Sequence, residues 1–166
     1  QVKQVFAQLP DYAYEHLFID NASKDGTVAL LREIARQDKH VKVIVNVRNF
    51  GHIRSPYYGL LQARGDAVIV LASDMQDPPA LIPDFIRKWE EGYKVVMGVK
   101  NKSKESRIVF AFRTFYYRLL RQMSEIELVE SYTGFGLYDQ QVIEILRTLN
   151  DPYPYFRGLI AELGFE

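Results

Sequence analysis

The sequence predicts an α/β fold with a mainly parallel sheet flanked by helices, and three observations support this prediction. Short apolar runs alternate along the chain with amphipathic stretches of helical spacing. Polar and acidic residues directly follow several of the apolar runs. The run at 67–72 (AVIVLA) is continuously apolar and rich in β-branched residues, which is typical of a strand buried on both faces of a parallel sheet.

Taken in order, the periodicity predicts strands and helices that alternate over most of the chain. Runs such as HLFID and VKVIV are short and apolar, whereas VALLREIARQ places its apolar residues on one helical face. With 166 residues the chain is long enough for one domain with its own core, so we predict a single domain over 1–166. The expected strands are 16–20, 41–45, 67–72, 93–99 and 133–138, and the expected helices are 3–9, 28–37, 56–64, 81–92, 106–123, 139–149 and 155–163.

Helix ends are marked by capping residues and by glycine. Ser55 and Pro56 are an N-cap residue and a first-turn proline for the helix that Gly65 closes. Asp77 stands before a pair of prolines and is expected to cap the following helix, which Gly92 ends.

The composition excludes several classes of protein. The 21 basic and 21 acidic residues balance, so no overall field attracts nucleic acid, and we expect no nucleic-acid partner. Without cysteine there is no disulfide framework and no thiolate zinc site, which fits a reducing compartment. No apolar run reaches the roughly 18 residues of a membrane-spanning helix. Because the positive and negative charges balance, any anion-binding site must be formed by a local group of residues.

The densest group of oxygen ligands follows the run at 67–72. Ser73, Asp74 and Gln76 come together there, and in open α/β sheets the ligand crevice lies outside the carboxyl ends of the strands. In an extended segment Asp74 and Gln76 would point the same way and could bind one divalent cation with the phosphates that it carries. The alternative is that Asp74 is only the polar end of a strand.

Two further polar segments are expected to open toward the same crevice. Asp20 and Asn21 end an apolar strand and can hydrogen-bond a nucleobase or a ribose, although Asn and Asp also form turns without any ligand. Arg48 and Asn49 lie in the polar loop that follows the next strand. These four residues are therefore candidates for nucleotide binding.

The stretch at 106–123 is basic and rich in aromatic residues. Arginine among Phe and Tyr at helical spacing is consistent with a membrane interface or with contact to a lipid phosphate. An ordinary amphipathic helix with its aromatic face on the core would give the same pattern. Arg107 and Arg113 are the basic residues that we expect to meet phosphate.

These segments resemble family 2 glycosyltransferases. The segment FIDNASKDGT is similar to the VDDGSxDGT segment of that family, and residues 46–100 are similar to the core of the branch that uses polyprenyl phosphate acceptors, including its DADLQDPP and GYxVV blocks. The similarity covers nearly the whole chain, and dolichyl- or undecaprenyl-phosphate sugar synthases are the nearest type. It implies the GT-A fold and transfer of a sugar from a nucleotide-sugar, commonly with Mg²⁺ or Mn²⁺. It also implies a role in cell-envelope polysaccharide or glycolipid synthesis at the cytoplasmic, inner face of the cell membrane.

The resemblance also implies roles for individual residues. Asp74 and Gln76 match metal-ligand positions, which makes Asp74 a catalytic candidate, and Lys100 matches a basic position in donor binding. Glu130, just before SYTGF, is by position the candidate general base for an alcohol acceptor, and the alternative is that it is a solvated acid of a loop. A polyprenyl phosphate acceptor is already an anion and needs no base. The implied reaction is a sugar transfer with inversion.

The chain departs from the family pattern at several positions. The first acid of the metal motif is Ala72 here, the second acid of the nucleotide motif is Asn21, and the glycine of that motif is Ala22. Phe135 and Gly136 stand where the family often has Phe-Arg. The rival hypothesis is therefore a non-catalytic module, derived from this family, that binds a nucleotide-sugar or a protein partner.

The family also has an apolar first strand, and a carboxyl-terminal part, for which this sequence has no counterpart. In the fold that strand would be internal, so we expect a gap in the sheet or an exposed edge. An exposed edge would pair with another chain, so a homo-oligomer is an expected assembly. The membrane surface is the other partner that we expect for the full-length protein.

Overall fold

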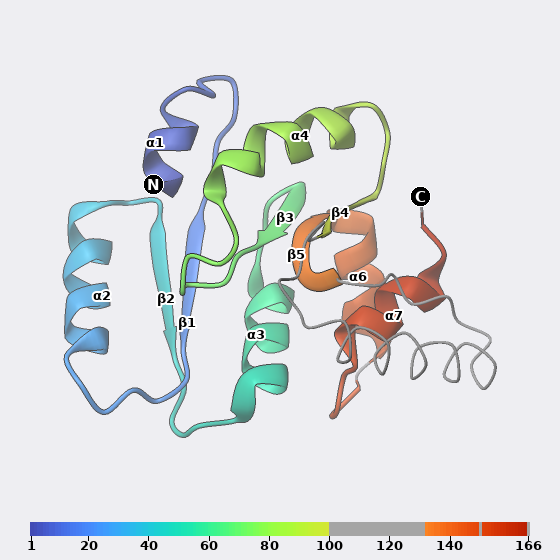
Figure 1. Ribbon diagram of the computed structural model, residues 1–166. Coiled ribbons are helices and arrows are strands. Elements are labelled where there is room, and N and C mark those ends of the chain that lie inside the picture. The colour runs from blue at the N-terminus through green and yellow to red at the C-terminus, as the bar shows by residue number, and fades with distance from the viewer. Residues whose placement is uncertain (100–131, 150, 166) are drawn as a thin grey trace, which may run out of the picture.

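The computed structural model describes residues 1–99, 132–149 and 151–165. Strands and helices alternate as predicted (Figure 1), and the first two strands coincide with their predicted ranges. The predicted helix at 106–123 lies outside the described residues. The described elements are α1 (Val2–Phe6), β1 (His16–Asp20), α2 (Thr27–Gln37), β2 (Val41–Val45), α3 (Gly51–Gln62), β3 (Ala67–Val70), the short 3₁₀ helix η1 (Pro79–Leu81), α4 (Ile82–Glu90), β4 (Val95–Val99), β5 (Tyr132–Asp139), α6 (Gln140–Leu149) and α7 (Phe156–Leu163).

The described strands form two sheets. β1 and β2 pair in parallel, with His16 opposite Val41 and Asp20 opposite Val45. β5 lies between β3 and β4 and is antiparallel to both. The α/β class and the parallel β1–β2 pair are confirmed, but the expectation of a parallel neighbour for β3 was wrong. A buried, apolar pattern indicates that a strand is covered on its faces and does not fix the direction of the strand beside it.

An interruption separates the two sheets. Within the described residues, β1 pairs only with β2, and β3 pairs only with β5. This agrees with the gap that the sequence analysis predicted. It also explains why all four residues of β3 are half-buried instead of fully buried, since β3 is an edge strand of its sheet.

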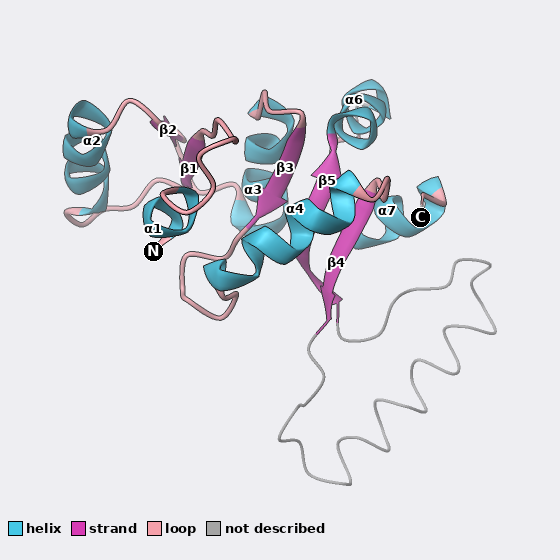
Figure 2. Cartoon of the chain, turned by 90° about the horizontal axis from the view of Figure 1, so that it is seen from above, coloured by secondary structure: helices cyan, strands magenta, loops and turns pink. Residues whose placement is uncertain are grey.

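Helices cover both faces of the three-stranded sheet (Figure 2). α1 and α4 lie on one face, where Ile82 packs in a cluster with Phe135 and Leu137 of β5. α3, α6 and α7 contribute to a second cluster around Tyr138. Successive side chains of a strand point to opposite faces, so β5 supplies both cores. Every residue of β5 except Thr133 is accordingly buried.

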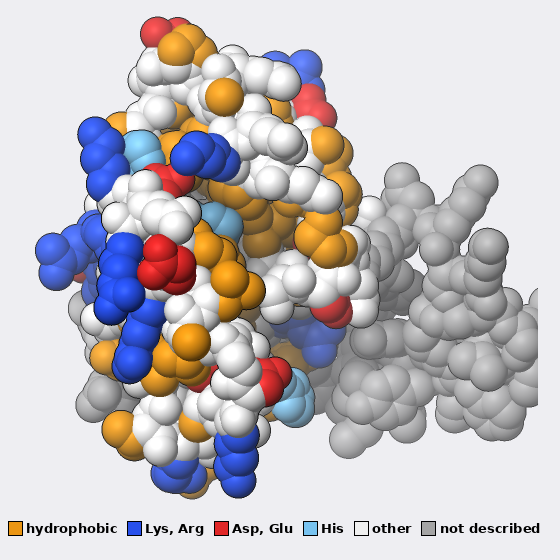
Figure 3. Space-filling model, turned by 90° about the vertical axis from the view of Figure 1, so that its left-hand side faces the viewer, with side chains coloured by type: hydrophobic (Ala, Val, Ile, Leu, Met, Phe, Trp, Pro, Cys, Tyr) orange, Lys and Arg blue, Asp and Glu red, His pale blue; other side chains and the backbone are white. Residues whose placement is uncertain are grey.

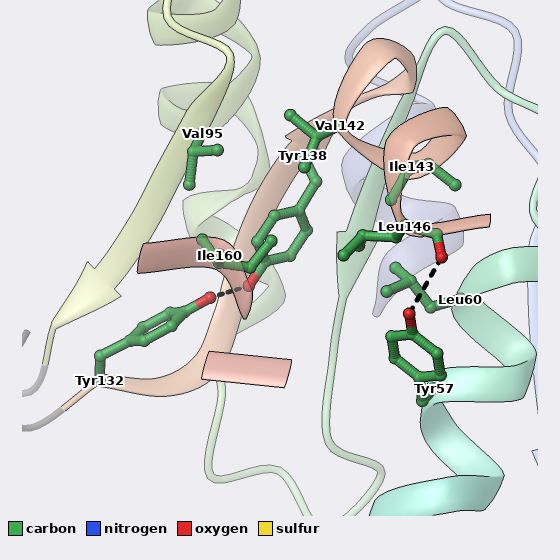
Figure 4. Close-up of a cluster of buried hydrophobic side chains, with 9 residues drawn as sticks. All are labelled: Tyr57, Leu60, Val95, Tyr132, Tyr138, Val142, Ile143, Leu146 and Ile160. Atoms are coloured by element: carbon green, nitrogen blue, oxygen red, sulfur yellow. Dashed lines mark hydrogen bonds between the residues drawn. The ribbon is translucent and has the colours of Figure 1, made fainter. Parts of the chain in front are cut away.

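The second core centres on Tyr138 and α6 (Figure 4). Tyr138, Ile143 and Leu146 are fully buried, and burying one such apolar side chain stabilises a fold by about 1.5–3 kcal/mol. The hydroxyl of Tyr132 hydrogen-bonds to that of Tyr138, which donates to the carbonyl of Gly134 at 2.8 Å. Burial raises the pKa of Tyr132 to about 12. The core therefore contains an uncharged, hydrogen-bonded tyrosine pair.

The predicted start of the third helix was wrong. α3 begins at Gly51, so Pro56 lies inside the helix. Ser55 is buried, and its hydroxyl oxygen accepts a hydrogen bond of 2.8 Å from the side-chain amide of Asn46. Serine often caps the start of a helix, but here the Ser55 side chain bonds to Asn46 in the loop before α3.

The predicted cap of the fourth helix was also wrong. Pro78 occupies the N-cap position of η1, and no side-chain hydrogen bond caps that helix. The buried Asp77 carboxylate accepts instead from the backbone N–H of Ala72 at 3.2 Å. Asp77 therefore closes the loop after β3.

Candidate functional site

Asn21 joins the end of β1 to the loop between β2 and α3. Its side-chain oxygen accepts from the Phe50 backbone N–H at 2.8 Å and from Asn46 Nδ2 at 3.3 Å. Its amide nitrogen donates to Asn49 Oδ1 at 2.9 Å and to the Gly51 carbonyl at 3.1 Å. An amide side chain has two acceptor positions and two donor hydrogens, and here all of them form hydrogen bonds within the loop. The structure thus brings Asn21 and Asn49 together, and a direct contact of either with a nucleotide stays a prediction.

Asp20 and Arg48 flank this network. Asp20 is only 5% exposed, and its Oδ2 accepts from the Ser23 backbone N–H at 2.9 Å. The turn that the sequence left as an alternative is therefore present at Asp20. Arg48 is exposed, with its guanidinium carbon 4.2 Å from the ring centroid of Phe50. Ala22 has φ +65°, a left-handed conformation that favours glycine.

The loop after β3 turns sharply at Met75, where φ is +66°. The Gln76 backbone N–H donates to Asp74 Oδ1 at 3.1 Å, and the Gln76 side-chain amide donates to Asp74 Oδ2 at 2.6 Å. The segment is not extended, so the prediction that alternation aligns the two side chains was wrong in its geometry. The turn nevertheless brings them into contact. Ser73, Asp74 and Gln76 are all exposed.

The oxygen atoms of this loop suit a metal ion that is also bound by a ligand. In the part of the chain that the structure describes, no three His, Cys, Asp or Glu side chains form a group that could hold a metal ion. Asp74 offers one exposed carboxylate, and Gln76 could add its amide oxygen after a turn of the amide, whose nitrogen now donates to Asp74. Mg²⁺ is commonly bound by one or two carboxylates together with substrate phosphates and waters. The loop is thus suited to a cation whose remaining ligands come from a diphosphate and water.

The predicted site residues fall into two groups that the described contacts do not join. No hydrogen bond or ion pair links Asp20 or Asn21 to Asp74 within residues 1–99, 132–149 and 151–165. Four further predicted residues lie outside the described residues, and their roles stay predictions: Lys100, Arg107, Arg113 and Glu130.

A pocket with a volume of about 490 Å³ lies beside the Asn21 network. Asn46 and Ser55, which are bonded to each other and in part to Asn21, line it. The rest of the lining comes from β2, the loop between β2 and α3, α3 itself, α6 and the segment after α6. Sequence reasoning missed this pocket because its walls come from segments that are far apart in the chain.

Basic side chains gather on the side of the molecule that α2 forms (Figure 3). Two ion pairs lie at α2 or directly after it: Arg36 with Glu33 at 3.3 Å, and Lys3 with Asp38 at 2.8 Å. Such a mixture of paired charges is an ordinary solvated surface. We therefore assign no ligand to it.

The fold is that of the GT-A glycosyltransferases. The chain is similar to the mannosyltransferase PcManGT from Pyrobaculum calidifontis, solved in complex with GDP-Man and Mn²⁺, with a TM-score of 0.53 and 18% sequence identity over 87% of this chain and 42% of that chain. It is also similar to residues 1–349 of S. aureus TarS, with a TM-score of 0.55 and 15% identity over 96% of this chain and 49% of that chain.

The chain belongs to glycosyl transferase family 2, whose family model matches residues 2–146. It is 38% identical to the uncharacterized glycosyltransferase YkcC of Bacillus subtilis (strain 168), over 100% of this chain and 51% of the relative. It is 31% identical to the bactoprenol glucosyl transferase of Shigella phage SfV, over 96% of this chain and 52% of the relative. The chain thus spans about half the length of these curated relatives. No helix among the described residues is long and apolar enough to cross a membrane.

Proposed function

We propose that the protein that carries this chain transfers a sugar from a nucleotide-sugar to a polyprenyl phosphate, with inversion, in cell-envelope synthesis. The observation that carries the proposal is the family match over residues 2–146 together with relatives that are named bactoprenol glucosyl transferases. A polyprenyl phosphate is a membrane lipid, so the proposed reaction takes place at the cell membrane; that it occurs on the cytoplasmic, inner face is part of the proposal. A homo-oligomer that pairs through a sheet edge remains part of the proposal.

The Asn21 network shapes the nucleotide side of the proposed site. It fixes the loop that carries Arg48 and Asn49 against the end of β1, where Asp20 lies. Arg48 is exposed and positively charged, so it can meet the donor without losing an ion pair within the described residues. Ser73 adds an exposed hydroxyl on the loop after β3. In the segment at 100–131, basic residues at Lys100, Arg107 and Arg113 are proposed to meet phosphate.

Asp74 and Gln76 are the residues that would hold Mg²⁺ or Mn²⁺. A divalent cation bound there would offset the negative charge that develops on the nucleoside diphosphate as it leaves. Asp74 contributes a full negative charge that favours binding of such a cation beside the diphosphate. The short hydrogen bond from Gln76 holds the Asp74 carboxylate in one orientation before any ligand arrives.

The acceptor decides whether the chain needs a general base. A phosphate acceptor is already ionised near neutral pH, so no side chain has to remove a proton from it. For an alcohol acceptor a base would be needed, and Glu130 is the residue proposed for it. Membrane preparations assayed with both acceptor types distinguish these cases.

The test uses the full-length protein in detergent with UDP-glucose or GDP-mannose, Mn²⁺ and undecaprenyl phosphate. We expect a lipid-linked sugar whose anomeric configuration, read by NMR, is opposite to that of the donor. Asp74→Asn should lower turnover by about 100-fold, whereas Asp84→Asn, at an exposed acid of α4 that pairs with Arg87, should leave it unchanged. Donor binding without any turnover under all these conditions would favour the rival binding module.

A further inference from the structure

The pocket beside the Asn21 network is mainly apolar. Its lining includes Ile44, Tyr57, Leu61 and Leu146. Its volume of about 490 Å³ is in the range of small-molecule sites, which are typically apolar with a few polar groups that fix orientation. The kind of ligand that fits the pocket depends on which polar groups of the lining are free to bond with it.

Most polar side chains of the pocket are already engaged. Asn46 Nδ2 donates to Ser55 Oγ and to Asn21 Oδ1. The guanidinium of Arg147 donates to the carbonyls of Leu61 and Ala63 at 2.9 and 2.6 Å and pairs with Glu144 at 2.5 Å. A nucleobase, which needs partners for several polar atoms on its edges, would find few of them here.

Arg54 differs from these residues. It is exposed, and its guanidinium carbon lies 4.7 Å from the ring centroid of Tyr153, which is itself 75% exposed. Within the described residues Arg54 takes part in no ion pair, so its donors are available to an anion. Asp151 also lines the pocket, and its Oδ1 accepts from the Tyr153 backbone N–H at 2.8 Å. Its carboxylate repels an anion, so a phosphate would have to bind on the side of Arg54 that faces away from it.

Exposed apolar and aromatic side chains continue the pocket onto the surface. Val47 is 93% exposed and Tyr58 is 51% exposed, and both line the pocket. With Arg54 and Tyr153 they form what we name the Arg54 groove, defined by Val47, Arg54, Tyr58 and Tyr153. An arginine among aromatic side chains suits the boundary between a charged head group and an apolar tail.

We propose that the Arg54 groove and its pocket bind a prenyl phosphate, with the phosphate on Arg54 and the isoprenoid tail on the apolar lining. This inference rests on the proposed function, which it deepens by giving the lipid acceptor a place on this chain. Two observations carry it: Arg54 has no ion pair within the described residues, so its charge can complement a phosphate, and the pocket offers an apolar surface with few free hydrogen-bonding groups. The pocket also shares Asn46 and Ser55 with the network that reaches the proposed nucleotide side.

The experiment measures binding of farnesyl phosphate to the full-length protein in detergent by isothermal titration calorimetry, with farnesol and inorganic phosphate as comparison ligands. Arg54→Gln should weaken farnesyl phosphate binding by about tenfold, the worth of a charge-assisted hydrogen bond. Tyr58→Ala should weaken it by about fivefold through lost apolar contact. Both side chains are exposed, so neither change should unfold the chain.

Matched controls come from a second cation–aromatic pair. Lys88 lies 5.5 Å from the ring centroid of Tyr93, which is 45% exposed and does not line the pocket. Lys88→Gln and Tyr93→Ala should leave the affinity for farnesyl phosphate unchanged. If these variants weaken binding as much as those in the groove, the ligand binds nonspecifically and the proposal is wrong.

The comparison ligands separate the remaining outcomes. Equal affinity for inorganic phosphate would indicate a free-phosphate site, and equal affinity for farnesol would indicate an apolar pocket without phosphate recognition; either result overturns the proposal. A full-length protein that transfers sugar to a prenyl phosphate but is insensitive to Arg54→Gln would overturn this inference and leave the proposed function intact.

Discussion

The side-chain amide of Gln76 donates a hydrogen bond of 2.6 Å to the carboxylate of Asp74. The Gln76 backbone N–H donates to the other carboxylate oxygen at 3.1 Å. An ionised carboxylate has about four acceptor positions, so two remain for a cation. Binding through Gln76 would require its amide to turn, because the nitrogen now faces Asp74. The two residues therefore form a prearranged pair in which only Asp74 is ready to bind a metal.

Restoring the acid of the family's metal motif should strengthen metal binding. Ala72 is exposed, and it is its backbone N–H that contacts Asp77, so a larger side chain can be placed there. We expect Ala72→Asp to tighten Mn²⁺ binding in the presence of UDP by about tenfold, because a second carboxylate adds charge to the site. Calorimetry provides the affinity, and Ala80→Asp, at an exposed position of η1, is the control. An unchanged affinity would mean that position 72 does not face the cation.

Asn21→Asp should destabilise the loop that Asn21 organises. The variant is isosteric, but it replaces the amide that donates to Asn49 Oδ1 and Gly51 O by an acceptor. We expect a loss of about 1–3 kcal/mol in the free energy of unfolding, measured by urea titration. The loss should shrink at acidic pH, where the introduced carboxyl is protonated and can donate. Gln8→Glu, at an exposed position, should show no such loss, and equal stability of the two variants would contradict this account.

Ala22→Gly should not destabilise the protein, although glycine usually does. Ala22 has φ +65°, and this conformation costs an L-residue roughly 1–2 kcal/mol. Relief of that strain outweighs the greater freedom of glycine in the unfolded chain, so we expect a gain of about 0.5 kcal/mol. Ala29→Gly, at an exposed position inside α2, should instead lose about 1 kcal/mol. Thermal unfolding of both variants checks the contrast, and losses of equal size would show that position 22 is unstrained.

Asp139 should make stability depend on pH below neutrality. Burial opposes its charge, but Trp89 Nε1 at 2.7 Å, the Gln141 backbone N–H at 2.9 Å and Lys94 Nζ at 2.9 Å lower the pKa of its carboxyl. The folded pKa lies below the unfolded value of about 3.9, so the stabilisation is complete above that pH and is lost as the pH falls through the folded pKa.

Asp139→Asn should therefore flatten the acid limb of the stability profile and lower the free energy of unfolding near pH 7 by about 2 kcal/mol. The chain has one tryptophan, so the fluorescence of Trp89 reports unfolding next to the changed residue. Asp84→Asn serves as the control, since its side chain is 60% exposed. An unaltered acid limb in the Asp139 variant would assign the pH dependence to other carboxylates.

The tyrosine pair of the core should respond asymmetrically to loss of its hydroxyl groups. Tyr138→Phe leaves the Tyr132 hydroxyl and the Gly134 carbonyl without their bonds, whereas Tyr132→Phe leaves the bond between Tyr138 and Gly134 intact. We expect Tyr138→Phe to cost about 1–3 kcal/mol more than Tyr132→Phe, because an unsatisfied buried polar group is expensive. Denaturant unfolding of the two single variants measures the difference. Equal losses would mean that the Gly134 carbonyl finds another donor.

The sequence by itself determined the class of the fold and most of its elements. The apolar runs HLFID and VKVIV became β1 and β2 with the predicted bounds, because short apolar runs that are bounded by polar and turn-forming residues favour strands over helices. The segments around Asp20 and Asp74 carried enough family-specific sequence to indicate a glycosyltransferase. These features depend on residues that are close together in the chain, so the sequence alone is enough to predict them.

Only the tertiary structure decided which groups meet. Asp77 and Ser55 have the side chains of helix caps, but contacts to Ala72 and Asn46 engage them elsewhere. The direction of β5 between β3 and β4, and the pocket shared by β2, α3 and α6, also depend on segments distant in the chain. The physical reason is that a polar group or a strand edge forms hydrogen bonds with the partner that packing brings near it. The sequence pattern of a single segment does not identify that partner.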